Sequence, residues 1–185
     1  MVNVNNRNDP FSRVKRWFVG PYDHVFMYIG KVGVLVTRRQ PRILRFSMLF
    51  ESNGRGVVVQ SLSNRYGQEV AVMRLKPEYR KRIPAILGEA IKLASEDNAY
   101  YDYLCIAQFV LPRLICKKLH LPLPLKYQRN PLMICSEALL EVFLRAKVLI
   151  LPEKVVPLPG DFIESGIVDE AQRGRLSPEW VLSPQ

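Results

Sequence analysis

Residues 131–144, with the sequence PLMICSEALLEVFL, place a cysteine where a loop turns into a helix. After Cys135, apolar residues such as Leu139 and Phe143 recur at three- and four-residue spacing, with charged residues between them, which predicts an amphipathic helix. Pro131 suits the turn that precedes it. We therefore expect Cys135 in the first helical turn, where backbone N–H groups and the helix dipole favour a thiolate over a thiol.

Upstream of this helix, the apolar pattern has the two-residue period of β-strands. Four segments are rich in β-branched and aromatic residues and are separated by short breaks. Their short connections predict an antiparallel meander, with VGVLVT (32–37) as part of the return strand of the first hairpin. The four segments are YDHVFMYIG (22–30), RILRFSMLFES (42–52), GVVVQSLS (56–63) and EVAVMRLK (69–76).

After Lys76 the pattern becomes helical. Residues 77–98 predict one helix with Pro84 in its first turn, and residues 101–119 predict a second that Pro112 ends or kinks. Residues 120–131 predict an extended linker, and the proline-rich segment 150–166 predicts an edge strand or an irregular strap. Strands followed by helices indicate an α+β domain, with one antiparallel sheet packed against helices. We expect a basic N-terminal arm at 1–20, the domain at 21–165 and a C-terminal tail at 166–185.

Composition limits the classes of function without choosing one. The 185 residues have a formal net charge of +10, so the expected partners are polyanions: an anionic cell wall such as peptidoglycan, a membrane surface or nucleic acid. No sequence motif for nucleic-acid binding is present. Three cysteines without framework spacing indicate a reducing compartment. The N-terminal sequence has no apolar stretch typical of a secretory signal and no apolar run has membrane-spanning length, so we expect cytoplasmic residence or delivery by lysis or a virion.

A catalytic cysteine needs a base and a group that holds the base in place. The sequence offers two histidines, and His24 lies at the start of the first predicted strand. Alternation places Glu51 near the end of the second predicted strand, so neighbouring strands would let its carboxylate reach the His24 ring. Each residue also has a structural interpretation: Cys135 as a small core residue, His24 as a hydrogen-bonded strand residue and Glu51 as a surface carboxylate.

A metal site is the competing hypothesis for the second histidine. Cys116 and His120 are four residues apart and would share one helix face. A structural zinc needs four ligands, and the sequence has neither a CxxC pair nor a second ligand pair, so we predict no metal and no cofactor.

Three motifs together resemble a known family. DHVFMYIG (23–30) resembles the histidine-bearing strand of NlpC-type papain-like cysteine hydrolases. YYDYL (100–104), followed by MICSEALLEVF (133–143), is similar to signatures of their circularly permuted branch, the YiiX-like amidases. The order histidine, carboxylate, cysteine is the order expected after the permutation. PLPGDFIESG (157–166) is similar to the C-terminal strap of that branch, and the resemblance covers about residues 22–165.

The resemblance implies a circularly permuted papain-like (NlpC-type) α+β fold, in which Cys135 is the nucleophile, His24 the general base and acid, and Glu51 the group that orients His24. The N–H of Cys135 would be one oxyanion donor. Tyr101, as a second oxyanion donor, and Asp102 are implied to line the cleft. Asp102 has an alternative role as a helix cap. Tyr28 and Ser136, which lie in the same motifs, complete the candidate substrate-binding residues.

The expected activity is that of a cysteine amidase or peptidase, which cleaves an amide bond through an acyl-enzyme. Cell-wall peptides are the first substrate class that we consider. A lipid or N-acyl amide, bound at a membrane surface through the apolar segment 104–125, is the second. The third interpretation is a catalytically inactive basic structural or interaction module, such as a virion component.

Overall fold

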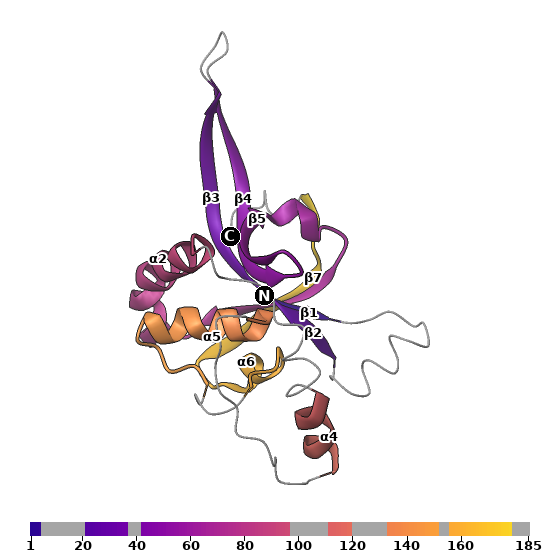
Figure 1. The fold of residues 1–185 in the computed structure, drawn as a ribbon. Helices are drawn as coiled ribbons and strands as arrows, with labels where there is room; N and C mark the ends of the chain where they lie inside the picture. Colours follow the sequence, from indigo (N-terminus) through magenta and orange to yellow (C-terminus); the bar gives the residue numbers. More distant parts are fainter. Residues whose placement is uncertain (5–20, 37–41, 97–110, 120–132, 152–155, 179–185) are drawn as a thin grey trace.

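Alternating apolar residues form strands of two antiparallel sheets, which pack against helices in a mixed α+β arrangement (Figure 1). The computed structural model describes residues 1–4, 21–36, 42–96, 111–119, 133–151 and 156–178. The predicted α+β class with antiparallel strands and packed helices is confirmed at this level. The strands form two sheets, however, and not the single sheet that we predicted.

The first sheet is a three-stranded antiparallel meander. Its order is β3 (Met27–Val36), β4 (Arg42–Asn53) and β5 (Gly56–Ser61). The segment that we expected to return as a partner strand instead continues β3 to Val36, because Gly30 sits at a bulge with a φ of 107°. Glycine adopts this left-handed backbone conformation without the steric cost of a side chain.

The second sheet contains both terminal parts of the described chain. Its order is β2 (Tyr22–Val25), β1 (Val2–Val4), β6 (Glu69–Leu75) and β7 (Val168–Arg175). The start of the predicted N-terminal arm is therefore an inner strand, and part of the predicted C-terminal tail pairs with β6 along seven residues. Short strand segments without clear alternation gave no sequence signal for either pairing, because partner strands, and not local propensity, stabilise them.

Phe26 carries the chain from the second sheet into the first. It lies between β2 and β3, and its N–H donates to the carbonyl oxygen of Met1 at 3.0 Å. Beyond it, β3 pairs with β4 so that Met27 faces Phe50. This connection places the end of β2 beside the inner end of β4, where the candidate residues lie.

The helices follow most of the strands along the chain. The predicted helix at 77–98 is a 3-10 turn (Pro77–Arg82) followed by α2 (Ile83–Ala94), with Pro84 in the first turn as predicted. The predicted helix after the linker is α5 (Cys135–Arg145). The proline-rich segment is irregular except for α6 (Asp161–Glu164). Of the predicted helix 101–119, α4 (Leu111–Leu119) is described, with Pro112 as its second residue, whereas 101–110 and the linker 120–131 lie outside the described residues.

Among the described residues, two apolar clusters hold the layers together. In the larger one, α5 packs beside α2 and against both sheets, with Phe50, Leu93 and Leu140 almost wholly buried. The smaller cluster, which includes Phe26 and Leu49, occupies the opposite side of β4. Alternation along β4 therefore sends successive side chains into different clusters, which makes this strand the partition between them.

Helix α4 is tied to α6 by an ion pair. Arg113 Nη1 lies 2.8 Å from Asp161 Oδ2, and both side chains are mostly buried. Asp161 Oδ2 also accepts a hydrogen bond from the N–H of Leu158 at 2.8 Å. Within the described part of the chain, no helix is both long enough and apolar enough to cross a membrane.

Because β1 is buried, shortening the Val2 side chain should lower the stability of the protein. Val2 is 1% exposed in the larger cluster, so Val2→Ala should lower the free energy of unfolding by about 2 kcal/mol through lost burial and a residual cavity. Val32→Ala is the matched control, because Val32 is 46% exposed and its truncation should cost less than about 0.5 kcal/mol. Urea denaturation measures the free energy of unfolding of both variants. Equal denaturation midpoints for the two would contradict the placement of β1 in the core.

Candidate active site

Cys135 is the first residue of α5 and is buried. The chain enters the helix in an extended conformation at Ile134, whose N–H donates to Glu137 Oε2 at 2.8 Å. Glu137 thus satisfies a backbone donor at the helix start, where a negative charge also suits the helix dipole. The cysteine at this helix start, predicted from its spacing, is confirmed.

Two side-chain hydroxyls fix the helix start to the rest of the protein. Ser52 Oγ on β4 donates to the Met133 carbonyl oxygen at 2.6 Å, just before Cys135. Ser136 Oγ, just after it, donates to the Pro157 carbonyl oxygen at 2.7 Å. The thiol is therefore held between β4 and the proline-rich segment. Ser136 is fully buried and helps to position the helix start through this bond, and its predicted contact with substrate stays a prediction.

His24 and Glu51 meet across the junction of the two sheets. His24 lies on β2, Glu51 lies on β4, and His24 Nε2 is 2.8 Å from Glu51 Oε2. The register that pairs Met27 with Phe50 carries the end of β2 past Glu51. The sequence-based hypothesis that Glu51 reaches the His24 ring agrees with this geometry.

The thiol of Cys135 hydrogen-bonds to the same imidazole. Because the ring also contacts Glu51 through Nε2, the imidazole links the thiol to the carboxylate. The thiol sulfur also receives hydrogen bonds from the backbone N–H groups of Val25 and Ser136. The three predicted catalytic residues therefore form one connected series: thiol, imidazole, carboxylate.

The electrostatics of the series favour a charged pair. Burial raises the pKa of Cys135, but the positive charge of His24 and the hydrogen bonds to sulfur outweigh burial and hold that pKa below its ordinary value. Burial likewise lowers the pKa of His24, yet the charge of Cys135 and hydrogen bonds to Cys135 and Glu51 raise it to about 9. Between these two pKa values the stable form is thiolate and imidazolium, the form in which cysteine is a nucleophile.

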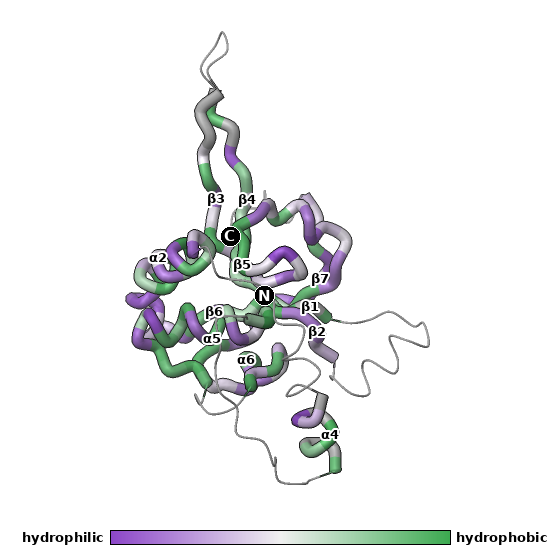
Figure 2. The backbone as a smooth tube through the Cα atoms, viewed as in Figure 1, coloured by the Kyte–Doolittle hydropathy of each residue, from purple (hydrophilic) through white to green (hydrophobic). Residues whose placement is uncertain are grey.

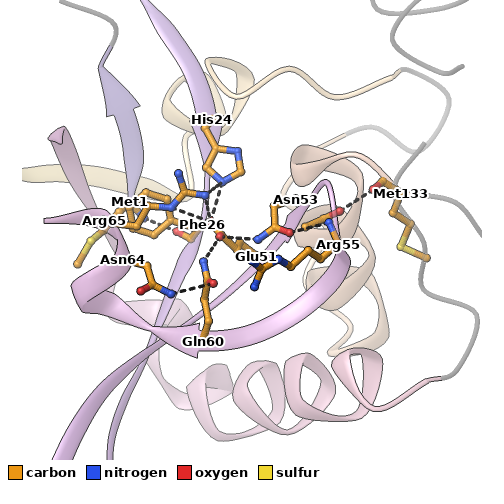
Figure 3. A network of polar contacts seen from close by, with 11 residues as sticks. Met1, His24, Phe26, Glu51, Asn53, Arg55, Gln60, Asn64, Arg65 and Met133 are labelled. Carbon is orange, nitrogen blue, oxygen red and sulfur yellow. Dashed lines mark hydrogen bonds and ion pairs between the residues drawn. The ribbon is translucent and has the colours of Figure 1, made fainter. Parts of the chain in front are cut away.

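Glu51 is surrounded by donors (Figure 3). Its side chain has no solvent exposure, and its Oε1 accepts from Asn53 Nδ2 at 2.9 Å and from Gln60 Nε2. Asn64 Nδ2 in turn donates to Gln60 Oε1 at 3.0 Å. Burial raises the pKa of Glu51, but the hydrogen bonds from His24 and Asn53 and the positive charges of His24 and Arg65 hold it below its ordinary value. The carboxylate therefore stays ionised where it faces His24.

Arg65 is a fourth charged member of the cluster. Its Nη2 lies 2.5 Å from Glu51 Oε2 and 3.1 Å from His24 Nε2, and its guanidinium lies 5.7 Å above the centre of the Phe26 ring. Arg65 and His24 thus share one carboxylate oxygen, and the positive charge of Arg65 opposes protonation of His24. Because the neighbouring guanidinium lowers the pKa of His24 while Cys135 and Glu51 raise it, Arg65 tunes the imidazole.

The other predicted substrate-binding residues are Tyr28, Tyr101 and Asp102. Tyr28, on β3, is 37% exposed. Phe26 is buried next to His24, with 6.0 Å between the centres of the two rings. Tyr101 and Asp102 lie outside the described residues. The structure therefore brings together Cys135, His24 and Glu51, and the grouping of the four predicted binding residues stays a prediction.

Sequence analysis missed Arg65, Gln60 and Asn53. Gln60 carries a usable signal, since it is a polar residue in an otherwise apolar strand and pairs with Leu49, two residues from Glu51. Arg65 carries none, because it reaches Glu51 only after the 3-10 turn Leu62–Arg65 folds back along β4.

A cavity of about 330 Å³ lies elsewhere, between α4 and α6. Its charged lining residues are Arg113, Asp161 and Glu164, of which the first two are paired with each other, and no member of the triad lines it. In the described ranges no group of three or more His, Cys, Asp or Glu residues could hold a metal ion. His120, from the competing metal hypothesis, lies outside those ranges.

Comparisons with known proteins identify no relative: no family model, no curated protein and no solved structure matches this chain. The chemistry of the site therefore carries the functional argument.

The charged pair predicts selective alkylation. Iodoacetamide should modify Cys135 faster than Cys116 at pH 6, because the thiolate is the reactive form and the positive charge of His24 lowers the pKa of Cys135. His24→Ala should slow the alkylation of Cys135 at pH 6 by about tenfold or more, because burial would then dominate the pKa of Cys135. Peptide mass spectrometry separates the sites. Equal alkylation rates at Cys135 and Cys116, unchanged by His24→Ala, would exclude a thiolate–imidazolium pair of Cys135 and His24.

Replacing Arg65 tests the tuning of His24. Arg65→Gln should raise the pKa of His24 above about 9, because it removes the nearby positive charge. The imidazole would then no longer share Glu51 Oε2 with a guanidinium. Histidine NMR titration measures this directly, since the sequence holds only two histidines. Arg55→Gln, which changes an exposed residue of the turn between β4 and β5, should leave the His24 pKa in place. A fall in that pKa with Arg65→Gln would refute the assignment.

Proposed function

We propose that this protein is a thiol hydrolase that cleaves an amide bond through an acyl-enzyme. The single observation that supports the proposal is the hydrogen-bonded series of Cys135, His24 and Glu51, with the thiol at the start of a helix. A nucleophile, its base and an orienting carboxylate are the parts that covalent acyl transfer requires.

The proposed reaction has two halves. In the first, the Cys135 thiolate attacks the amide carbonyl, and the tetrahedral intermediate expels the amine as His24 gives it a proton. This forms a thioester on Cys135. In the second, His24 takes a proton from water, the hydroxide attacks the thioester, and the acid product leaves as the thiolate and imidazolium re-form. Glu51 stabilises the imidazolium throughout, and the backbone N–H of Cys135 is the proposed oxyanion donor.

We place the protein by analogy among the circularly permuted papain-like enzymes, in the YiiX-like branch. The chain order His24, Glu51, Cys135 and the helix that begins at the cysteine support this placement. An antiparallel sheet packed against helices agrees with it as a fold class. The analogy is to a class of sites, because function follows the site more closely than the fold.

Cell-wall peptides are the proposed substrates. The net charge of +10 supports this class, since it would retain the enzyme on an anionic wall. A second candidate is an acyl amide at a membrane surface, acted on by the same triad as hydrolase or acyltransferase. The exposed apolar side chains Ile115 and Leu119 of α4 favour that candidate.

Activity on purified peptidoglycan tests the proposal. Fragments with newly freed amines should appear with the unaltered protein and not with Cys135→Ala. Glu51→Gln should lower kcat/KM by about 100-fold or more, because the amide fills the same space but no longer compensates the imidazolium. Mass analysis of fragments, with phospholipid and N-acyl amide incubated in parallel, distinguishes the two substrate classes.

A matched control separates chemistry from folding. Glu141→Gln changes a carboxylate on the far part of the same helix α5 and should leave kcat/KM unchanged. Turnover of both substrate classes by Cys135→Ala at the original rate would refute the thiol mechanism. No turnover of any amide and no acylated Cys135 would favour the inactive module.

A further inference from the structure

The outer part of the β3–β4 hairpin extends beyond the body of the protein (Figure 1). From Gly30 to Val36, β3 pairs with β4 from Met48 back to Arg42, and β5 begins its pairing with β4 only at Met48. Among the described strands, the outer hairpin therefore has no third strand on either edge. A two-stranded ribbon is marginal in water on its own, so a partner surface would stabilise it.

The outer hairpin exposes apolar side chains. Val32 is 46% exposed, Ile43 64% and Phe46 43%, and Val32 is paired directly with Phe46 across the two strands. Figure 2 shows hydrophobic residues on both strands of this extension. Exposed apolar side chains grouped on one projecting element indicate an interaction surface more strongly than the same residues scattered singly.

The same segment carries only positive charge. Residues 30–47 contain five Lys or Arg and no Asp or Glu. Of these, Lys31 and Arg45 are exposed on the described strands, next to Val32 and Phe46 respectively. Cations beside apolar side chains match a surface that is anionic outside and apolar a few ångströms below, which is the surface of an anionic bilayer.

We infer that the outer hairpin, residues 30–36 and 42–47, is an arm that docks on anionic lipid membranes, with Val32 and Phe46, which share one face, entering the interface, and with Lys31 and Arg45, which share the other face, reaching the headgroups around it. A second copy of this chain fits less well, because two ribbons paired edge to edge would bring like charges together. Nucleic acid would match the cations but leave the apolar side chains without a complementary surface. The inference does not depend on the proposed hydrolase activity.

Vesicle flotation tests this inference. The full-length protein should bind vesicles of phosphatidylcholine with phosphatidylglycerol and bind pure phosphatidylcholine weakly. Val32→Ser/Phe46→Ser should weaken binding by about tenfold or more through lost apolar insertion. Lys31→Gln/Arg45→Gln should weaken it by about tenfold and reduce its sensitivity to salt.

Matched controls use exposed residues away from the arm. Ile91→Ser, on α2, and Lys81→Gln/Arg82→Gln, before it, should leave vesicle binding unchanged. Iodoacetamide labelling of Cys135 should be normal in every variant, which shows that each is folded and separates failure of this inference from failure of the triad. Vesicle binding unaffected by both arm variants would overturn the inference. So would binding of the arm to duplex DNA or RNA in preference to vesicles, or dimerisation that the arm variants abolish.

Discussion

The carboxylate of Glu51 is removed from water on β4, and a buried negative charge must be compensated by the groups that surround it. His24, Arg65, Gln60 and Asn53 provide that compensation. They come from β2, the 3-10 turn, β5 and β4 itself, so the cluster requires the two sheets to be correctly joined. Removing one partner would leave charge uncompensated, which makes the arrangement both a structural tie and the support of the imidazole.

The thiol depends on this cluster indirectly. Cys135 is buried, a condition that disfavours its ionisation, and it receives compensation from His24 and from backbone N–H groups. His24 in turn stays protonated because the charge of Cys135 and hydrogen bonds to Cys135 and Glu51 outweigh its burial and raise its pKa. Charge is thus balanced along a chain of contacts from β4 to the start of α5. Arg65 acts against the imidazolium at the same carboxylate oxygen, so the balance is adjustable at one residue.

Local patterns predicted the helix at Cys135, the strands that bear His24 and Glu51, and the proline at the start of α2, because each depends on periodicity or turn chemistry within a few residues. The division into two sheets was not predictable in the same way. It depends on Phe26 redirecting the chain and on Val2–Val4 and Val168–Arg175 joining β6, which are pairings between distant segments. Arg65 was missed for the same reason, since only tertiary folding brings it to Glu51.

The central position of β6 has a consequence for synthesis. Its two neighbours are β1, which lies far before it in the chain, and β7, which follows about ninety residues after β6. The sheet cannot be completed until β7 has left the ribosome, and contacts of such long sequence separation slow folding. Cys135 also emerges late, long after His24. The nascent polypeptide is thus expected to carry an ordinary thiol through most of translation, and to acquire its ionised form only when the distant segments have closed around it.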